Sequence, residues 1–206
     1  RFFKLLECLN IQPQGTHLEF PITRSELMRV NRMLEQIGLN GKRYVCLHPG
    51  ARDPRRRWPV DHFAFIANQL ATRDCSIILT GSMAEKDLLG DLQRKVQKPV
   101  INLVEAFGHL NAGELAGILK YAQLLISNDT GVSHLASALQ VSSVIIFSPF
   151  SDIGRWRPLD GQLHIAIPYA EAADPHHVWE KVRLLLDADD RENAASAIQN
   201  NQAACC

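Results

Sequence analysis

Cysteine is scarce in this chain, and its placement argues against two kinds of site. The 206 residues include five cysteines, and none of them forms a C-x-x-C pair or has histidine companions at zinc-ligand spacing. The sequence therefore supports neither a structural metal site nor the disulfide framework of a small secreted domain. A reducing compartment fits best, so we expect a cytoplasmic protein that binds no metal.

Long apolar runs and an excess of one charge are also missing. The longest apolar stretch, residues 115–126, is interrupted by Lys120 and Gln123, and it is too short to span a bilayer. No signal-peptide pattern is present. Lys and Arg number 22, as do Asp and Glu, so the formal charge is zero. Because no global field would attract nucleic acid, we expect no such partner, and any bound anion requires a local cluster of positive groups.

Three common active-site fingerprints are absent as well. The chain has no Walker loop, no G-x-G-x-x-G after an expected strand and no G-x-S-x-G elbow. Kinase, dinucleotide dehydrogenase and α/β-hydrolase functions therefore lose their usual support. Nucleotide binding without a glycine-rich fingerprint remains open.

The chain does contain a regular alternation of short apolar runs and amphipathic segments. Strands are expected at residues 43–48, 76–80, 100–102, 123–127, 143–147 and 163–167, and helices at 61–72, 84–96, 112–121, 130–139 and 177–186. Such βαβ units require right-handed crossovers and give a parallel sheet covered on both faces. We expect a doubly wound, Rossmann-like α/β domain whose ligand lies at the carboxyl ends of the strands.

The domain boundaries follow from changes in this pattern. Residues 1–40 are interpreted as a linker and a helix from a missing amino-terminal domain, with Thr23 and Glu26 forming a capping box at the start of the helix. Residues 41–187 form the expected Rossmann-like domain. Residues 188–206, rich in Ala, Asn and Gln, are expected to be a disordered tail. The chain begins at Arg1 without a methionine, so we expect it to be a fragment of a longer protein.

The loop after the first core strand carries the local positive cluster. Residues 48–59 read HPGARDPRRRWP, with four arginines within six positions. Guanidinium groups pair with phosphate oxygens in a fork, and each charge-assisted bond contributes on the order of 1.5–3 kcal/mol before desolvation costs. The competing interpretation is a solvated basic loop, which is common for such runs.

The loop after the fourth strand resembles an anion seat. Residues 127–134 read SNDTGVSH, so Asp129 or Thr130 would cap the following helix, and Gly131 would leave its amide open to close approach. His134 lies one turn beyond Thr130 on the same helix face. The alternative is that Asp129 only caps the helix and that His134 is a satisfied interior histidine.

Two further loops contribute weaker signals. Glu85 follows the strand at 76–80 and could accept hydrogen bonds from ribose hydroxyls, or it could only compensate the dipole in the first turn of a helix. Residues 155–158 read RWRP and offer donors and a stacking face for a sugar or an acceptor.

Taken together, these loops resemble a known family. The motifs HPGA with RRWP, LTGS, and SNDTGVSHLASAL, in this order and spacing between residues 44 and 168, are similar to the carboxy-terminal half of the lipopolysaccharide heptosyltransferases, glycosyltransferase family 9. The resemblance implies a two-domain GT-B fold and a metal-independent, inverting transfer from ADP-heptose, without a cofactor, to a lipopolysaccharide core acceptor. It further implies a Gram-negative source and peripheral association with the inner face of the inner membrane.

The resemblance also implies that residues 41–187 are the nucleotide-sugar-binding domain, and it implies residue roles. Arg56, Thr130, Gly131 and His134 would hold the diphosphate, and Glu85 the ribose. Asp129 is assigned to the heptose hydroxyls or the helix cap, because a carboxylate beside phosphates is repulsive.

No general base for the acceptor hydroxyl is identified in the chain, so its catalytic residues stay unassigned and we expect donor binding without turnover. Two other functions stay open. One is a non-catalytic nucleotide-binding module, and the other is a GT-B enzyme that uses UDP-sugars.

Overall fold

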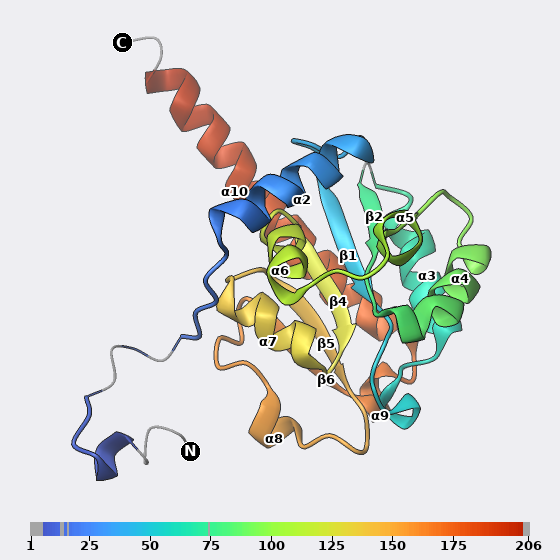
Figure 1. Ribbon diagram of the computed structural model, residues 1–206, viewed down its shortest axis with the longest axis horizontal. Coiled ribbons are helices and arrows are strands. Elements are labelled where there is room, and N and C mark those ends of the chain that lie inside the picture. The colour runs from blue at the N-terminus through green and yellow to red at the C-terminus, as the bar shows by residue number, and fades with distance from the viewer. Residues whose placement is uncertain (1–5, 13–14, 16, 74, 204–206) are drawn as a thin grey trace.

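The computed structural model describes residues 6–12, 15, 17–73 and 75–203, and its centre is a six-stranded parallel sheet (Figure 1). The strands are β1 (Tyr44–His48), β2 (Ser76–Leu79), β3 (Ile101–Asn102), β4 (Leu124–Asn128), β5 (Ser143–Phe147) and β6 (His164–Pro168). Their order is β3-β2-β1-β4-β5-β6, and every neighbouring pair is parallel. The predicted doubly wound fold is confirmed.

Helices cover both faces of the sheet (Figure 1). One face carries α3 (Val60–Leu70), α4 (Lys86–Lys95), α9 (Tyr169–Ala172) and α10 (Pro175–Ala203). The other carries α2 (Arg24–Gln36), α5 (Leu103–Phe107), α6 (Ala112–Lys120) and α7 (Gly131–Ala138). The shorter helices η1 (Pro54–Arg56), η2 (Met83–Glu85) and α8 (Ile153–Trp156) follow β1, β2 and β5.

The apolar residues of each strand divide between two cores, because successive side chains point to opposite faces. In β1, Val45 and Leu47 join the cluster beneath α3 and α10, whereas Tyr44 and Cys46 join the cluster beneath α2 and α6. A central strand buried on both faces reads as a continuous apolar run, as the sequence indicated. The hydroxyl of Tyr44 donates to the carbonyl of Ile118 over 2.6 Å, which satisfies the polar atom of this buried ring.

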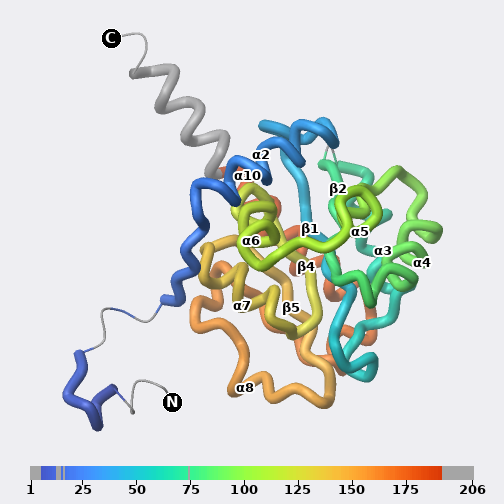
Figure 2. The backbone as a smooth tube through the Cα atoms, viewed as in Figure 1, coloured from blue at the N-terminus to red at the C-terminus, as the bar shows by residue number. Residues whose placement is uncertain are grey.

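The strand order reverses between β1 and β4. The chain leaves β1 toward β2 and β3 on one side, then returns past α6 to β4 on the other side, as Figure 2 shows. His48 lies beside Ser127 in the register of β1 and β4. The loops that follow these two strands therefore begin next to each other at the carboxyl edge, where doubly wound sheets bind ligands.

Helix α2 belongs to this domain, in contrast to its predicted assignment to another one. The predicted capping box of Thr23 and Glu26 is present. Val30 and Leu34 are fully or almost fully buried in the core shared with α6. The sequence pattern identifies an apolar helix face, but not the surface against which that face packs.

The segment predicted to be a disordered tail is helical over most of its length. Helix α10 extends from Pro175 to Ala203, beyond the predicted end at Leu186, and residues 204–206 lie outside the described residues. No glycine or proline interrupts residues 188–203, and alanine favours helix. At the start of this segment, Asp187 and Asp190 form ion pairs with Arg73, and Asp189 and Asp190 do so with Arg43.

Within the part of the chain that the structure describes, we find no helix with both the length and the apolar character required to cross a bilayer.

Candidate functional site

The basic loop after β1 folds into a tight turn. The side chain of Asp53 accepts a hydrogen bond from the amide of Arg55 over 3.0 Å and caps η1, and Pro54 occupies its first position. This position tolerates proline because an N–H group at the start of a helix has no partner inside the helix, so nothing is lost when it is absent. The turn sends successive arginine side chains in different directions.

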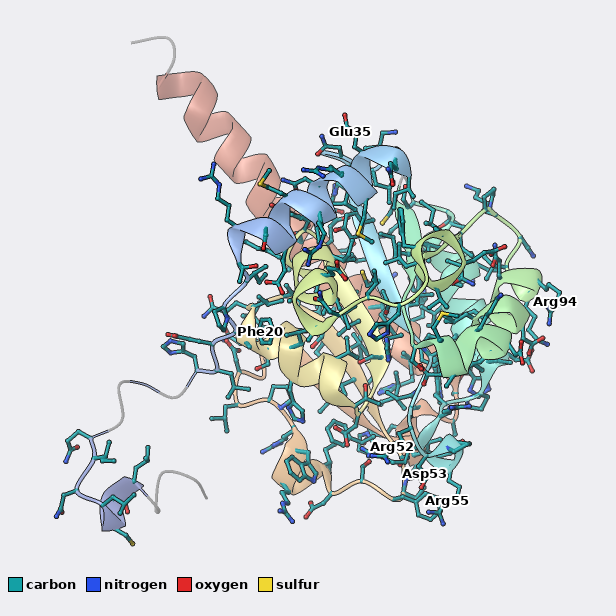
Figure 3. The ribbon with its side chains drawn as sticks, in the orientation of Figure 1. Phe20, Glu35, Arg52, Asp53, Arg55 and Arg94 are labelled. Carbon is teal, nitrogen blue, oxygen red and sulfur yellow. The ribbon has the colours of Figure 1, made fainter. Side chains whose placement is uncertain are left out.

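Of the four arginines, Arg56 is the one that bonds to the loop after β4. The side chain of Arg55 is paired with Asp53 and stacks on Phe150, with its guanidinium carbon 4.9 Å from the ring centre. Arg52 is exposed, and Figure 3 shows it close to Asp53 and Arg55 on the lower side of the molecule. Arg57 turns back and donates to the carbonyl of Ala51 over 2.9 Å. The predicted cluster is therefore a divergent set of side chains.

Arg56 spans the carboxyl edge to the end of β4. Its Nη2 donates to both the carbonyl and the Oδ2 of Asp129, each over 2.6 Å, and its Nε donates to the Oγ of Ser151 over 3.0 Å. The Asp129 side chain is 4% exposed and that of Arg56 33% exposed. A guanidinium with one buried partner and one open side is thus fixed directly before the first turn of α7.

The tip of α7 is built as the sequence predicted, with one correction. Thr130 is the N-cap residue in an extended conformation, but its side chain makes no capping bond, and its buried Oγ1 has no partner among the described residues. Asp129 binds Arg56 instead of capping the helix, so the predicted cap role of its carboxylate is wrong. The first amides of a helix have no partners inside it, and in α7 they lie, with the positive end of the helix dipole, at the carboxyl edge of the sheet.

Gly131 and His134 lie on the exposed side of this helix tip. A Cβ added to Gly131 would meet no atom within 4 Å beyond its chain neighbours and its own helix backbone, so the space beside its Cα is open. The ring of His134 is partly buried and lies edge-on to Trp156, with ring centres 6.0 Å apart. Trp156 is 40% exposed and belongs to α8, so the RWRP segment forms the rim beside His134.

Glu85 is the last residue of η2, which follows β2, and its carboxylate completes a cap. Its Oε2 accepts hydrogen bonds from the amide and the hydroxyl of Ser82, which completes a capping box. Its Oε1 lies 3.9 Å from Nη2 of Arg57. An added Cβ at Gly50 would lie 2.1 Å from the same oxygen, so this position must be glycine while the carboxylate stays there.

His48 was not predicted as a site residue, although it ends β1 at this edge. Its Nδ1 lies 3.0 Å from the hydroxyl of Thr80. Burial lowers the pKa of His48 to about 4, while the nearby carboxylate of Glu85 acts in the opposite direction. The imidazole is therefore neutral at pH 7. A histidine at the end of an expected strand was the only sequence signal for it.

Asn128 is the second residue that sequence reasoning missed. It is fully buried at the end of β4, and its carboxamide bonds to the basic loop at both Gly50 and Trp58. Its only signal in the sequence is a polar residue at the last position of an apolar strand. Among the described residues, no group of three or more His, Cys, Asp or Glu is placed to hold a metal ion.

Comparison with known proteins gives a consistent set of similarities. The family model of glycosyltransferase family 9 (heptosyltransferase) matches residues 1–183. Lipopolysaccharide heptosyltransferase 3 of Escherichia coli is 27% identical over 132 residues, which make up 63% of this chain and 38% of that protein. The chain therefore spans well under half the length of this relative. These matches confirm the resemblance predicted from the motifs.

Two solved structures share the fold. The family 9 glycosyl transferase of Veillonella parvula DSM 2008 superposes with a TM-score of 0.73 at 21% identity, over 81% of this chain and 48% of that one. The E. coli ADP-heptose LPS heptosyltransferase II gives a TM-score of 0.72 at 22% identity, over 87% and 56% of the two chains.

Proposed function

The chain belongs to glycosyltransferase family 9, the heptosyltransferases, and from this premise we propose that its carboxyl edge binds an ADP-sugar by the diphosphate. The observation that carries the proposal is the contact of Arg56 Nη2 with the carbonyl of Asp129. This contact brings a guanidinium to the residue that immediately precedes the cap of α7. Two kinds of anion-binding group, cationic and dipolar, then act on the same space.

Arg56 can serve the protein and a phosphate at the same time. A guanidinium has five N–H donors in a planar fork. The bonds to Asp129 and Ser151 use Nη2 and Nε, which leaves the two donors of Nη1 for a ligand oxygen. Asp129 thus orients the guanidinium rather than meeting the phosphates itself, and its second role in the proposal is to accept a hydrogen bond from a heptose hydroxyl.

The remaining roles follow from the same placement. The amides of the α7 tip at Thr130 and Gly131, together with His134, would hold the diphosphate, and Glu85 would accept from the ribose. When the glycosidic bond breaks, negative charge develops on the departing ADP, and donors fixed in advance stabilise that charge. The general base that activates the acceptor is unassigned among the described residues.

The finer features of the reaction belong to the proposal. The name of the E. coli structural relative includes ADP-heptose, and relatives of this chain are lipopolysaccharide heptosyltransferases. We propose the same donor, a lipopolysaccharide core acceptor, and an inverting transfer without a metal or cofactor. The reaction would take place in the cytoplasm, at the inner face of the inner membrane.

Calorimetric titration of the 206-residue chain tests the proposal. We expect binding of ADP and an ADP-sugar, and weaker binding of adenosine because the diphosphate supplies much of the affinity. Arg56→Ala should weaken ADP binding by about tenfold or more, which is the loss of one charge-assisted bond. Arg32→Ala, on the exposed side of α2, is the matched control and should bind like the wild type.

Two results would contradict the proposal. One is the absence of ADP binding by the wild type, and the other is an Arg56→Ala variant with unchanged affinity. Tighter binding of UDP than of ADP would replace the proposed donor by a UDP-sugar.

A further inference from the structure

Asn128 ends β4, and its side chain bonds to both ends of the basic loop. Its Nδ2 donates to the carbonyl of Pro49 over 2.8 Å and, more weakly, to that of Gly50 over 3.3 Å. Its Oδ1 accepts from the amide of Trp58 over 2.8 Å. The side chain is fully buried. One carboxamide therefore closes the loop from Gly50 to Trp58 as a clasp.

Arg56 lies inside this closed loop and bonds back to the residue that follows Asn128. The clasp and the bond between Arg56 and Asp129 connect the same two segments of the chain. The second anchor of Arg56, the hydroxyl of Ser151, comes from the loop after β5. Without the clasp, Arg56 would be held only by its partly buried contacts with Asp129 and Ser151 and by the bond of Arg57 Nε to the carbonyl of Ala51.

We propose that Asn128 is a positioning residue of the donor site, which acts through the basic loop to hold Arg56 at the tip of α7. The expected effect of Asn128 on ADP affinity rests on the proposed function. Its expected effect on the position of Arg56 does not. The chemistry requires an amide, because the partners are two carbonyl oxygens and one N–H. Aspartate would face both carbonyls without a donor, and an aliphatic residue would leave all three backbone groups unsatisfied in a buried place.

The first arm of the test measures ADP affinity in a double-mutant cycle. We expect Asn128→Ala to weaken ADP binding by about tenfold or more, as Arg56→Ala does. Because both changes remove the same contact with the ligand, the double variant should bind ADP no more weakly than Arg56→Ala alone. A role in stability alone would give no such coupling, so additive losses would overturn the proposal.

The matched control is Asn68→Ala. Asn68 lies in α3, and its Oδ1 accepts from the amide of Gln97 over 2.8 Å, so it also holds a loop through a long-range bond. That loop precedes β3 and lies at the opposite edge of the sheet. Asn68→Ala should lower the melting temperature without changing ADP affinity. An equal loss of affinity in this control would overturn a specific role for Asn128.

The second arm does not depend on ADP. The Nε–H proton of Arg56 should exchange slowly with solvent in the wild type and in Asn68→Ala, and fast in Asn128→Ala, as measured by nuclear magnetic resonance. Slow exchange of this proton in Asn128→Ala would overturn the proposed role of Asn128, whether or not the wild type binds ADP. Absence of ADP binding by the wild type would contradict only the proposed function. If Asn128→Ala does not fold, Asn128→Ser, which keeps a polar group, takes its place in both arms with the same expected results.

Discussion

Asp129 shows how a buried carboxylate beside a helix tip can orient a guanidinium instead of capping the helix. Its side chain is almost completely buried, and it is compensated by Arg56, which has one open side. The sequence suggested a helix cap because aspartate is common there. The pairing with a residue 73 positions earlier in the chain prevails because a buried charge needs an opposite charge more than a helix tip needs a cap.

We predict that Asp129→Ala lowers the free energy of unfolding by about 1–3 kcal/mol, because the change leaves Arg56 without its buried partner. Asp91→Ala removes a carboxylate that is paired with the exposed Arg94, and it should cost less than about 1 kcal/mol. Urea denaturation of both variants measures the difference. Equal decreases in the free energy of unfolding would contradict a larger contribution from the buried pair of Arg56 and Asp129.

A second prediction concerns the pH dependence of stability. The pKa of His48 falls from its ordinary value of 6.5 to about 4 in the folded domain. Between these values the unfolded chain binds a proton at His48 and the folded domain does not. The contribution of His48 to the free energy of unfolding should therefore be fully present above pH 6.5. It should decrease by on the order of 1–3 kcal/mol as the pH falls toward 4.

His48→Gln isolates this contribution. Urea denaturation at pH 7.5 and 4.5 should show a smaller loss of stability in the variant than in the wild type. His164, whose pKa burial also lowers, is present in both proteins and cancels from the comparison. An identical change in the free energy of unfolding between the two pH values in both proteins would contradict the lowered pKa of His48.

At the scale of elements, the approach of α2 to α6 depends on a glycine. A Cβ at Gly117 would lie 2.7 Å from Cγ2 of Val30, which is fully buried. Alanine is about 1 kcal/mol better than glycine inside an exposed helix, so the sign of a Gly→Ala change depends on the space around the Cβ.

We therefore expect Gly117→Ala to destabilise the domain by about 1–3 kcal/mol through overpacking. Gly90→Ala, in α4, is the control: its Cβ would meet the end of the Arg94 side chain at 3.5 Å, an ordinary contact. This variant should be as stable as the wild type or more stable. Thermal unfolding distinguishes the two, and the same effect in both variants would show that α2 does not pack closely on α6.

Sequence reasoning predicted most elements because their signals are local. Strand β5 has its predicted bounds, since both of its faces are buried and apolar residues fill the whole run. A general rule, that the loops after adjacent parallel strands meet, predicted that the basic loop lies near the segment before α7, and the family resemblance singled out Arg56 within that loop. The clasp of Asn128 was not accessible, because its partners are backbone groups 70 to 79 positions away, which have no sequence signature.

At the scale of the whole molecule, the two edges of the sheet have different tasks. The amino edge carries ion pairs between the start of β1 and α10, such as that of Arg43 with Asp189. The carboxyl edge collects the loops after β1, β2, β4 and β5, and with them Arg56, Glu85, the α7 tip and Trp156. The proposed donor site therefore lies on loops, while the cores beneath both helical layers hold the sheet.

The central claim is that Arg56 and the first amides of α7 bind one diphosphate, and a nuclear magnetic resonance titration of the labelled chain with ADP tests it most directly. We predict that the amide signals of Gly131 and Val132 and the Nε–H signal of Arg56 shift together and saturate at the same ADP concentration. Binding of ADP that shifts signals elsewhere and leaves these three unchanged would contradict the account.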